Sequence, residues 1–158
     1  MRSGYHGSHC QLDQNSFMLN VGGHWLLQDP GYGRTATELH STLIVNGKGQ
    51  AASGGRIEAF GQVGDVLYVA GDAAPCYDAL DRFTRHVIMV DESYLVVLDE
   101  LVPAEGAVSV ESQLVTGVEE PEIVDGRTVR LGDEAGCEVV LGYEAEIQIL
   151  GDEGLKKL

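Results

Sequence analysis

The first fifty residues of this chain concentrate imidazole, carboxylate and amide side chains at spacings that suit metal binding or proton transfer. His9, Gln11 and Asp13 alternate along one short segment, and Asp29 and His40 follow further along the chain. Imidazole nitrogens and carboxylate oxygens are ligands for zinc and similar cations, and imidazole is the commonest general base. A purely structural β-domain has no use for such a group. The segment therefore predicts a site for a metal ion or an acidic sugar.

Turns and short strands carry these side chains. Residues 16–20 and 24–28 alternate in polarity around Val21-Gly22-Gly23, which predicts a hairpin. Asp29-Pro30-Gly31-Tyr32-Gly33 has turn composition, because proline fixes φ and glycine adopts positive φ. Asn46-Gly47, which follows another apolar run, is among the strongest hairpin signals. The candidate side chains are thus expected in loops at the ends of strands.

The rest of the chain continues the same pattern of short apolar runs separated by turn residues. Further strands are expected at residues 56–60, 66–70, 84–90, 94–98, 108–114, 128–131, 138–141 and 147–150. The nearly continuous apolar runs at 86–90 and 94–98 predict two central strands covered on both faces. Residues 72–82 predict a loop or helical turn, and residues 151–158 are expected to fray. About ten short strands predict an all-β, two-sheet antiparallel β-sandwich, with residues 1–158 as one domain.

The amino-acid composition restricts the classes of molecule that the chain could bind and the compartment where it is expected. The net charge of −15 argues against nucleic acid, whose binding depends on neutralising phosphates with Lys and Arg. A polyanionic sugar would need local cations, and the candidates are Arg2, Arg34, Lys48, Arg56, Arg82 and Arg85. No apolar run approaches the roughly 20 residues of a membrane span. Because the first residues contain no hydrophobic signal core, the chain as written is expected in the cytoplasm. An additional upstream segment would instead make it periplasmic or secreted.

Several blocks in fixed order carry a family resemblance. They are His9-x-Gln11-x-Asp13-x-x-Ser16-Phe17, Asp29-Pro30-Gly31-Tyr32, Tyr77-x-x-x-x-Arg82, Arg85-His-Val-Ile-Met-Val90, and Tyr94-Leu-Val-Val-Leu-Asp99. Together they resemble the C-terminal β-sandwich domain of heparinase II/III-like polysaccharide lyases, over roughly residues 4–142. The resemblance implies β-elimination of uronate-containing acidic polysaccharides. It also implies that an N-terminal (α/α) toroid, which this chain lacks, supplies most of the chemistry.

The resemblance also implies roles for individual residues. His9 would face the sugar carboxylate, and Tyr32 belongs to a loop whose tyrosine acts as acid or base in some members. Gln11, Asp29 and His40 occupy the metal-ligand positions, and the metal is zinc or another divalent cation. Gln11 replaces the family's second histidine, and an amide oxygen is a poor zinc ligand. Two further residues, Asn15 and Arg34, are expected to contact the sugar, although Asn15 could instead organise the turn together with Asp13 and Ser16.

Three hypotheses about the function follow. In the first, the chain is the C-terminal part of a polysaccharide lyase and is inactive alone. In the second, it is a non-catalytic sandwich that binds carbohydrate or docks on another subunit. That subunit would be a separately encoded toroid or a second copy joined through an edge strand. In the third, the chain is a truncated relic without activity.

Overall fold

The computed structural model describes residues 1–132, 136–142, 146–152 and 155–157. The first strands are β1 Leu19–Val21, β2 His24–Leu27, β3 Leu43–Val45, β4 Arg56–Val63, β5 Val66–Asp72, β6 Leu80–Val90 and β7 Tyr94–Pro103. The later strands are β8 Val110–Ser112, β9 Val115–Thr116, β10 Glu122–Ile123, β11 Thr128–Leu131, β12 Cys137–Val140, β13 Leu150–Asp152 and β14 Leu155–Lys157. Two 3-10 helices, η1 Thr37–Leu39 and η2 Ala74–Cys76, are the helical elements of the described part. Neither is long enough to cross a membrane.

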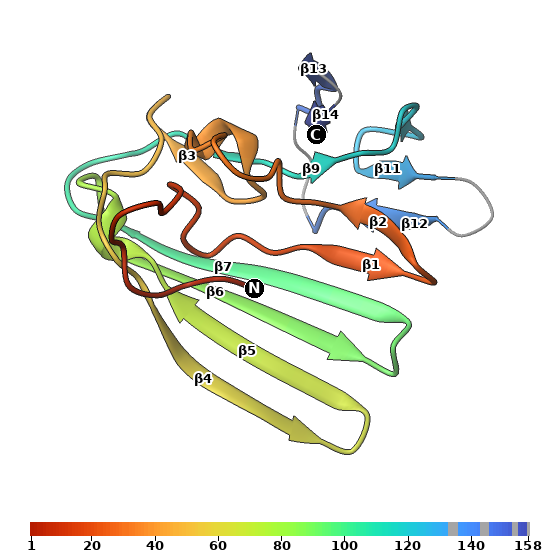
Figure 1. Cartoon of the computed structure of the whole chain (residues 1–158), viewed down its shortest axis with the longest axis horizontal. Coiled ribbons are helices and arrows are strands. Elements are labelled where there is room, and N and C mark those ends of the chain that lie inside the picture. The colour runs from red at the N-terminus through yellow and green to blue at the C-terminus, as the bar shows by residue number, and fades with distance from the viewer. Residues whose placement is uncertain (133–135, 143–145, 153–154, 158) are drawn as a thin grey trace.

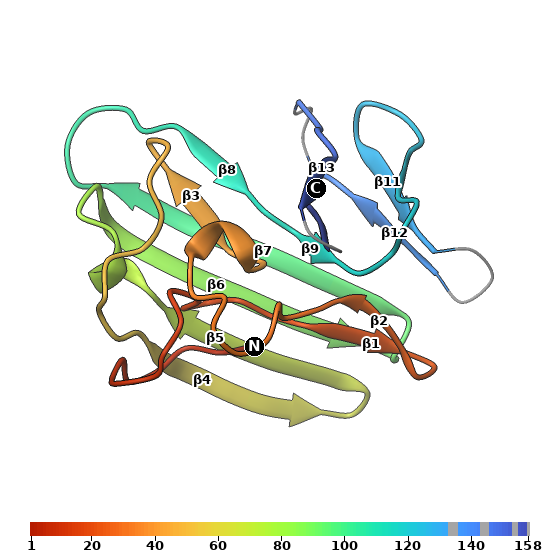
Figure 2. The same cartoon turned by 45° about the horizontal axis from the view of Figure 1, so that its top comes forward.

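One layer of the fold is a four-stranded antiparallel sheet in the order β4-β5-β6-β7 (Figure 1). The second layer is divided among smaller antiparallel sheets, β1-β2, β3-β8, β10-β11-β12 and β13-β14-β9 (Figure 2). All strand pairs are antiparallel. The predicted all-β fold with two packed antiparallel layers is therefore confirmed.

The apolar core lies between these layers in two clusters. In the first, Leu43 and Val45 of β3 pack with Phe83 of β6 and with Tyr77. The second cluster joins the hairpin β1-β2 to the C-terminal strands, and its buried members are Phe17, Leu27, Val129 and Leu131. Side chains that alternate along β6 and β7 reach this interior, because successive residues of a strand point to opposite faces. The two clusters hold the loops of the first fifty residues against the large sheet.

The predicted turn at Asn46-Gly47 is present. Both residues have positive φ, 52° and 67°. Val45 and Lys48 exchange two backbone hydrogen bonds of 3.0 Å across the turn. Two positive φ values define a type I′ turn, which asparagine and glycine adopt at the lowest cost. The sequence signal and the backbone geometry agree here.

The prediction that residues 94–98 form a central strand covered on both faces was wrong. Among the described residues, β7 is an edge strand whose one paired neighbour is β6. Val96 and Leu98 are 48% and 59% exposed, and both lie on the sheet face opposite to Asp99, which points inward. A continuous apolar run is typical of a strand buried on two faces, but it also occurs where an apolar sheet face is left open.

Residues 151–158 were predicted to fray, but residues 151–152 and 155–157 lie in paired strands, and residues 153, 154 and 158 lie outside the described residues. β13 and β14 form a hairpin, and β14 pairs with β9 through Lys156↔Thr116 and Lys157↔Val115. The short strand β9 has no alternation of its own that would reveal it. A tail can be fixed by main-chain pairing with a strand distant in the sequence, and such pairing leaves no local pattern.

A buried arginine links the two layers. Arg85 on β6 is 1% exposed, and its Nε and Nη2 donate to the two carboxylate oxygens of Asp99 on β7, both at 2.7 Å. Its Nη1 donates to the backbone carbonyls of Asn15 at 3.0 Å and Ser41 at 2.9 Å. Such a planar fork satisfies a buried charge better than lysine could. Arg85 is therefore a structural residue and does not contact sugar at the surface.

Replacing Arg85 with alanine is expected to lower the free energy of unfolding by about 3–5 kcal/mol, because Asp99 and two buried carbonyls lose their partner. The matched control is Arg82→Ala on the same strand. Arg82 also pairs with a β7 carboxylate, Glu100, but it is 55% exposed, so its loss is expected to cost at most about 1 kcal/mol. Urea unfolding followed by circular dichroism measures both. Equal losses for the two variants would contradict this account of Arg85.

Candidate functional site

A buried amide network fixes the loop that begins at His9. The backbone N–H of Gln14 donates to Oε1 of Gln50 at 2.8 Å, and Nε2 of Gln50 donates back to the carbonyl of Gln14 at 2.8 Å. This reciprocal pair imitates a backbone–backbone pair between strands. Gln50 also donates to the hydroxyl of Tyr77 at 3.0 Å, and that hydroxyl donates to the carbonyl of Leu43 at 2.7 Å. Because these groups are buried and satisfied, they hold the loop in one conformation.

Tyr77 is the ionisable member of this network. Burial raises its pKa to about 12, although hydrogen bonds from Gln50 and Thr42 oppose the shift. The hydroxyl therefore keeps its proton at physiological pH and remains a donor to Leu43. This network could not be predicted from the sequence, because Thr42, Gln50 and Tyr77 come from separate strands and loops. A polar residue inside a predicted apolar element, such as Thr42, was the available signal.

Asn15 belongs to the interior. It is fully buried, has a φ of 60°, and its Nδ2 donates to the carbonyl of Gly71 at 2.9 Å. A Cβ atom at Gly71 would lie 2.5 Å from Oδ1 of Asn15, so the close approach of loop and sheet depends on glycine there. This placement argues against the predicted sugar contact of Asn15. Its side chain instead fixes the loop on the large sheet, as in the alternative reading.

Three side chains of the first fifty residues converge into one cluster of donors. Asp13, Asp29 and His40 each offer a ligand atom, and these atoms lie within 4.8 Å of one another. Asp29 follows β2, and its Oδ1 accepts from the backbone N–H of Gly31 at 2.8 Å. That bond leaves Oδ2 directed toward His40, whose Nδ1 is 3.2 Å away. His40 directly follows η1. The Asp-Pro-Gly turn and the 3-10 helix thus position two of the three donors.

His40 is the most buried donor. It is 1% exposed, and neither ring nitrogen has a hydrogen bond of normal geometry. Burial lowers its pKa, and the carboxylates of Asp13 and Asp29 offset only part of that effect. The ring is therefore neutral at pH 7, which is the form that binds metal. A buried imidazole whose ring nitrogens form no hydrogen bond of normal geometry is costly unless a ligand satisfies it. One imidazole and two carboxylates fit a divalent cation such as zinc, with a solvent molecule completing the coordination.

Asp13 lies in the cluster although it was not among the predicted ligands. Gln11 is half-buried, and its Nε2 donates to the carbonyl of Gly31 at 2.8 Å. Its role as a metal ligand remains a prediction. Asp13 was expected to organise a turn, but its carboxylate lies in the cluster and is paired with Arg2. Burial raises the pKa of Asp13, with Arg2 and His40 opposing the shift. Asp13 was not predicted as a donor because the family resemblance places a ligand at position 11.

The two predicted catalytic residues lie side by side at the surface. The rings of His9 and Tyr32 have centroids 6.4 Å apart and meet edge to face at 84°. Both side chains are exposed, Tyr32 to 88%. His9 has a φ of 63°, an uncommon backbone conformation for a residue other than glycine. Arg34 is half-buried on the segment that follows Tyr32. The structure thus brings the imidazole and the phenol within reach of one ligand, and their contact with sugar remains a prediction.

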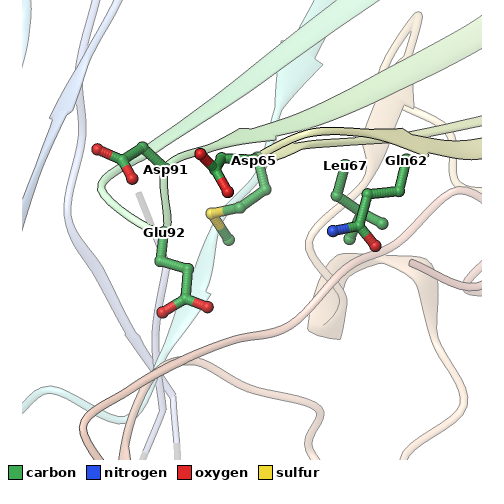
Figure 3. Close-up of a pocket in the computed structure, with 6 residues that line it drawn as sticks. Gln62, Asp65, Leu67, Asp91 and Glu92 are labelled. Carbon is green, nitrogen blue, oxygen red and sulfur yellow. The ribbon is translucent and has the colours of Figure 1, made fainter.

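A pocket of about 370 Å³ lies elsewhere, at the turns of the β4-β5 and β6-β7 hairpins (Figure 3). Its lining residues are Gln62, Asp65, Leu67, Met89, Asp91 and Glu92. Asp65, Asp91 and Glu92 are exposed carboxylates that would repel a polyanionic sugar. This pocket therefore contributes nothing to the candidate site.

Comparison with known proteins now decides the family. The family described as "Heparinase II/III-like, C-terminal" matches residues 1–152. The chain belongs to this family. The predicted resemblance is thereby confirmed over nearly the whole length of the chain. No curated protein matches this heparinase II/III-like C-terminal domain.

Solved structures share the fold of this heparinase II/III-like domain. One, described as heparinase III, the BT4657 gene product with methylated lysines, has a TM-score of 0.71 and 21% sequence identity. The match covers 84% of this chain and 23% of that one. Another is a heparan sulfate lyase HepC mutant from Pedobacter heparinus, with a TM-score of 0.70, 21% identity and coverage of 85% and 23%. The chain therefore spans less than a quarter of the length of these proteins.

The lowered pKa of His40 predicts a pH dependence of stability in the metal-free protein. The folded state resists protonating His40, so its contribution is complete above the ordinary pKa of 6.5 and is lost as the pH falls below it. His40→Gln removes this titration. Urea unfolding in the presence of a chelator at pH 7.5 and 5.5 should show a smaller acid-induced loss for His40→Gln than for the wild type. His24→Gln, at an exposed histidine, is the control and should behave as the wild type. Identical acid-induced losses for His40→Gln and the wild type would show that His40 titrates normally.

Proposed function

We propose that this domain is the β-sandwich part of a lyase that cleaves uronate-containing acidic polysaccharides by β-elimination. The observation that carries the proposal is the exposed pair of rings, His9 and Tyr32, at positions that match the family's motifs. The names of the solved relatives, heparinase III and heparan sulfate lyase, support an acidic polysaccharide as the substrate class. At 21% identity these relatives establish only the fold, so the activity is inferred from the site.

The proposed chemistry assigns one role to each ring. In β-elimination a base removes the proton α to the uronate carboxylate, the bond to the glycosidic oxygen breaks, and a carbon–carbon double bond forms. The leaving oxygen takes up a proton from an acid. His9 would donate to the uronate carboxylate and stabilise the charge that develops there. Tyr32 would transfer the proton as base or acid. The edge-to-face arrangement allows both polar ring edges to approach one sugar.

The domain alone lacks the environment that this chemistry needs. Tyr32 is 88% exposed, and hydrogen bonds in open water stabilise developing charge far less than those in a water-excluded cleft. A second wall is required to exclude water and to supply further donors. The (α/α) toroid expected from the family would provide that wall. We therefore propose that the isolated domain is inactive.

We propose that a zinc ion or another divalent cation has a structural role beside this pair. Asp29 and His40 would hold it together with Asp13. Asp13 lies four residues after His9, and Asp29 lies three residues before Tyr32. A metal held by both carboxylates would cross-link the two loops and fix the separation of the two rings. Gln11, through its bond to Gly31, already joins the same two loops.

One observation favours the alternative of a docking module. The open face of the large sheet is apolar, with Val63, Tyr94 and Leu98 exposed to 84%, 70% and 59%. Apolar patches of this kind mark interaction surfaces. Docking on a toroid and participation in catalysis are compatible, because a domain that completes a cleft must also bind the other half. A separate toroid and a second copy of this chain are the two partners that this reading allows.

The test follows absorbance at ultraviolet wavelengths during incubation with alginate, heparin, heparan sulfate and chondroitin sulfate. Elimination creates a conjugated unsaturated uronate, so product appears directly as new absorbance. The domain alone should give a flat trace, and addition of the family's toroid should produce a rise. His9→Ala or Tyr32→Phe should then reduce the rate about 100-fold or more. His24→Ala, at an exposed histidine outside the site, is the control.

Two results would contradict the proposal. A rise with the domain alone that disappears in His9→Ala would show that this sandwich carries a complete site. A rise with the toroid that is the same in wild type, His9→Ala and Tyr32→Phe would remove both rings from the reaction.

A further inference from the structure

Residues 1–4 form an N-terminal strap beside the donor cluster. Hydrogen bonds fix this strap at several points. The backbone N–H of Arg2 donates to the carbonyl of Ser16 at 2.8 Å and forms an isolated antiparallel bridge with it. The hydroxyl of Ser3 donates to the carbonyl of Asp72 at 3.0 Å. The N–H of Gly4 donates to Oε1 of Gln14 at 2.7 Å. The strap is therefore held by hydrogen bonds at Arg2 and at the two residues that follow it.

The side chain of Arg2 leaves this strap and binds the donor cluster. Its Nη1 donates to Oδ1 of Asp13 in an ion pair. Asp13 is buried to 4% exposure next to Asp29 and His40, and a second carboxylate nearby makes its own charge more costly. The guanidinium of Arg2 therefore supplies at Asp13 the positive charge that a metal ion would supply.

Arg2 and a metal ion cannot both be close to Asp13 without cost. The cluster has two carboxylates, so a divalent cation neutralises it completely and leaves the guanidinium facing a positive ion. The side chains also differ in freedom to move. The side chain of Arg2 is 37% exposed and can rotate into solvent, whereas the side chains of Asp13 and His40 are 5% and 1% exposed. If one group leaves when a metal ion enters, it is Arg2.

We propose that Arg2 is an internal competitor for the metal site, so that a divalent cation bound by Asp13, Asp29 and His40 displaces its guanidinium and loosens the N-terminal strap. The inference rests on the proposed metal site and adds a regulatory step to it. It assigns the third ligand position to Asp13 in place of Gln11. The second observation behind the ligand set is His40, whose two buried ring nitrogens have no hydrogen-bond partner of normal geometry.

The geometry needs only small movements. Zinc–oxygen and zinc–nitrogen bonds are about 2.0–2.2 Å, which places tetrahedral donors roughly 3.5 Å apart. The present donors lie within 4.8 Å of one another. Shifts of about 1 Å in the carboxylates would close the site, and the side chain of Asp29 is 33% exposed and can make such a shift. The Oδ1 of Asp13 that now accepts from Arg2 becomes available when the guanidinium leaves.

The test compares metal affinity in the metal-stripped domain at pH 7.5, by calorimetry with Zn²⁺ and by visible absorption with Co²⁺. Arg2→Ala should bind at least about tenfold more tightly than the wild type, because no cation has to be displaced. Arg2→Lys keeps the charge and should stay near the wild type. His40→Ala should lose binding, whereas Gln11→Ala should retain it. Arg82→Ala is the control for removing a surface arginine, and circular dichroism shows that each variant is folded.

Hydrogen exchange provides a readout independent of affinity. Adding Zn²⁺ to the wild type should speed exchange of the Arg2 amide, which now donates to Ser16. Weaker or unchanged binding in Arg2→Ala, with a wild type that binds metal, would overturn the competition and leave the metal site intact. No binding by any folded variant would overturn both the competition and the metal site. Neither result bears on whether His9 and Tyr32 act on sugar, which the absorbance assay tests separately.

Discussion

The bidentate pair of Arg85 with Asp99 is the interaction on which the arrangement of the site depends. It joins β6 to β7, and the remaining guanidinium nitrogen reaches out of the sheet to the carbonyls of Asn15 and Ser41. Those carbonyls lie in the two loops that also contain Asp13 and His40. One buried charge therefore sets the position of the donor cluster relative to the large sheet. A hydrophobic residue at 85 could fill the space, but it could not hold two loops by their backbones.

Buried hydrogen bonds near this ion pair make the site loops rigid, while the candidate catalytic rings are exposed to solvent. The amide pair of Gln14 and Gln50 and the Asn15–Gly71 contact fix one loop from below, where water has no access. His9 and Tyr32 extend from the same region into solvent. A binding or catalytic site requires this combination, because the buried residues that support the rings fix where the rings can lie. The same organisation leaves both rings open to solvent among the residues that the structure describes.

Features encoded by neighbouring residues could be predicted from the sequence, whereas features that depend on distant segments could not. The turn at Asn46-Gly47 and the hairpin β1-β2 are encoded by adjacent residues, and both were predicted. The proximity of His9 and Tyr32 could be predicted only through the family resemblance, because 23 positions separate them in the chain. Asp13 as a donor, and the pairing of β9 with β14, depend on contacts between distant segments. No local pattern specifies such contacts, so they emerged only from the structure.

The distribution of arginines bears on how a polyanion could be bound. Carboxylates already pair with several of the cations considered from the sequence: Arg2 with Asp13, Arg56 with Glu58 and Asp72, Arg82 with Glu100, and Arg85 with Asp99. With a net charge of −15, the domain as a whole repels an acidic polysaccharide at long range. In the proposed function, the attraction that holds a polyuronate against His9 and Tyr32 would therefore come from a second, more basic surface. Charge alone favours such a two-part site, in which that surface would capture the substrate and this domain would position the two rings.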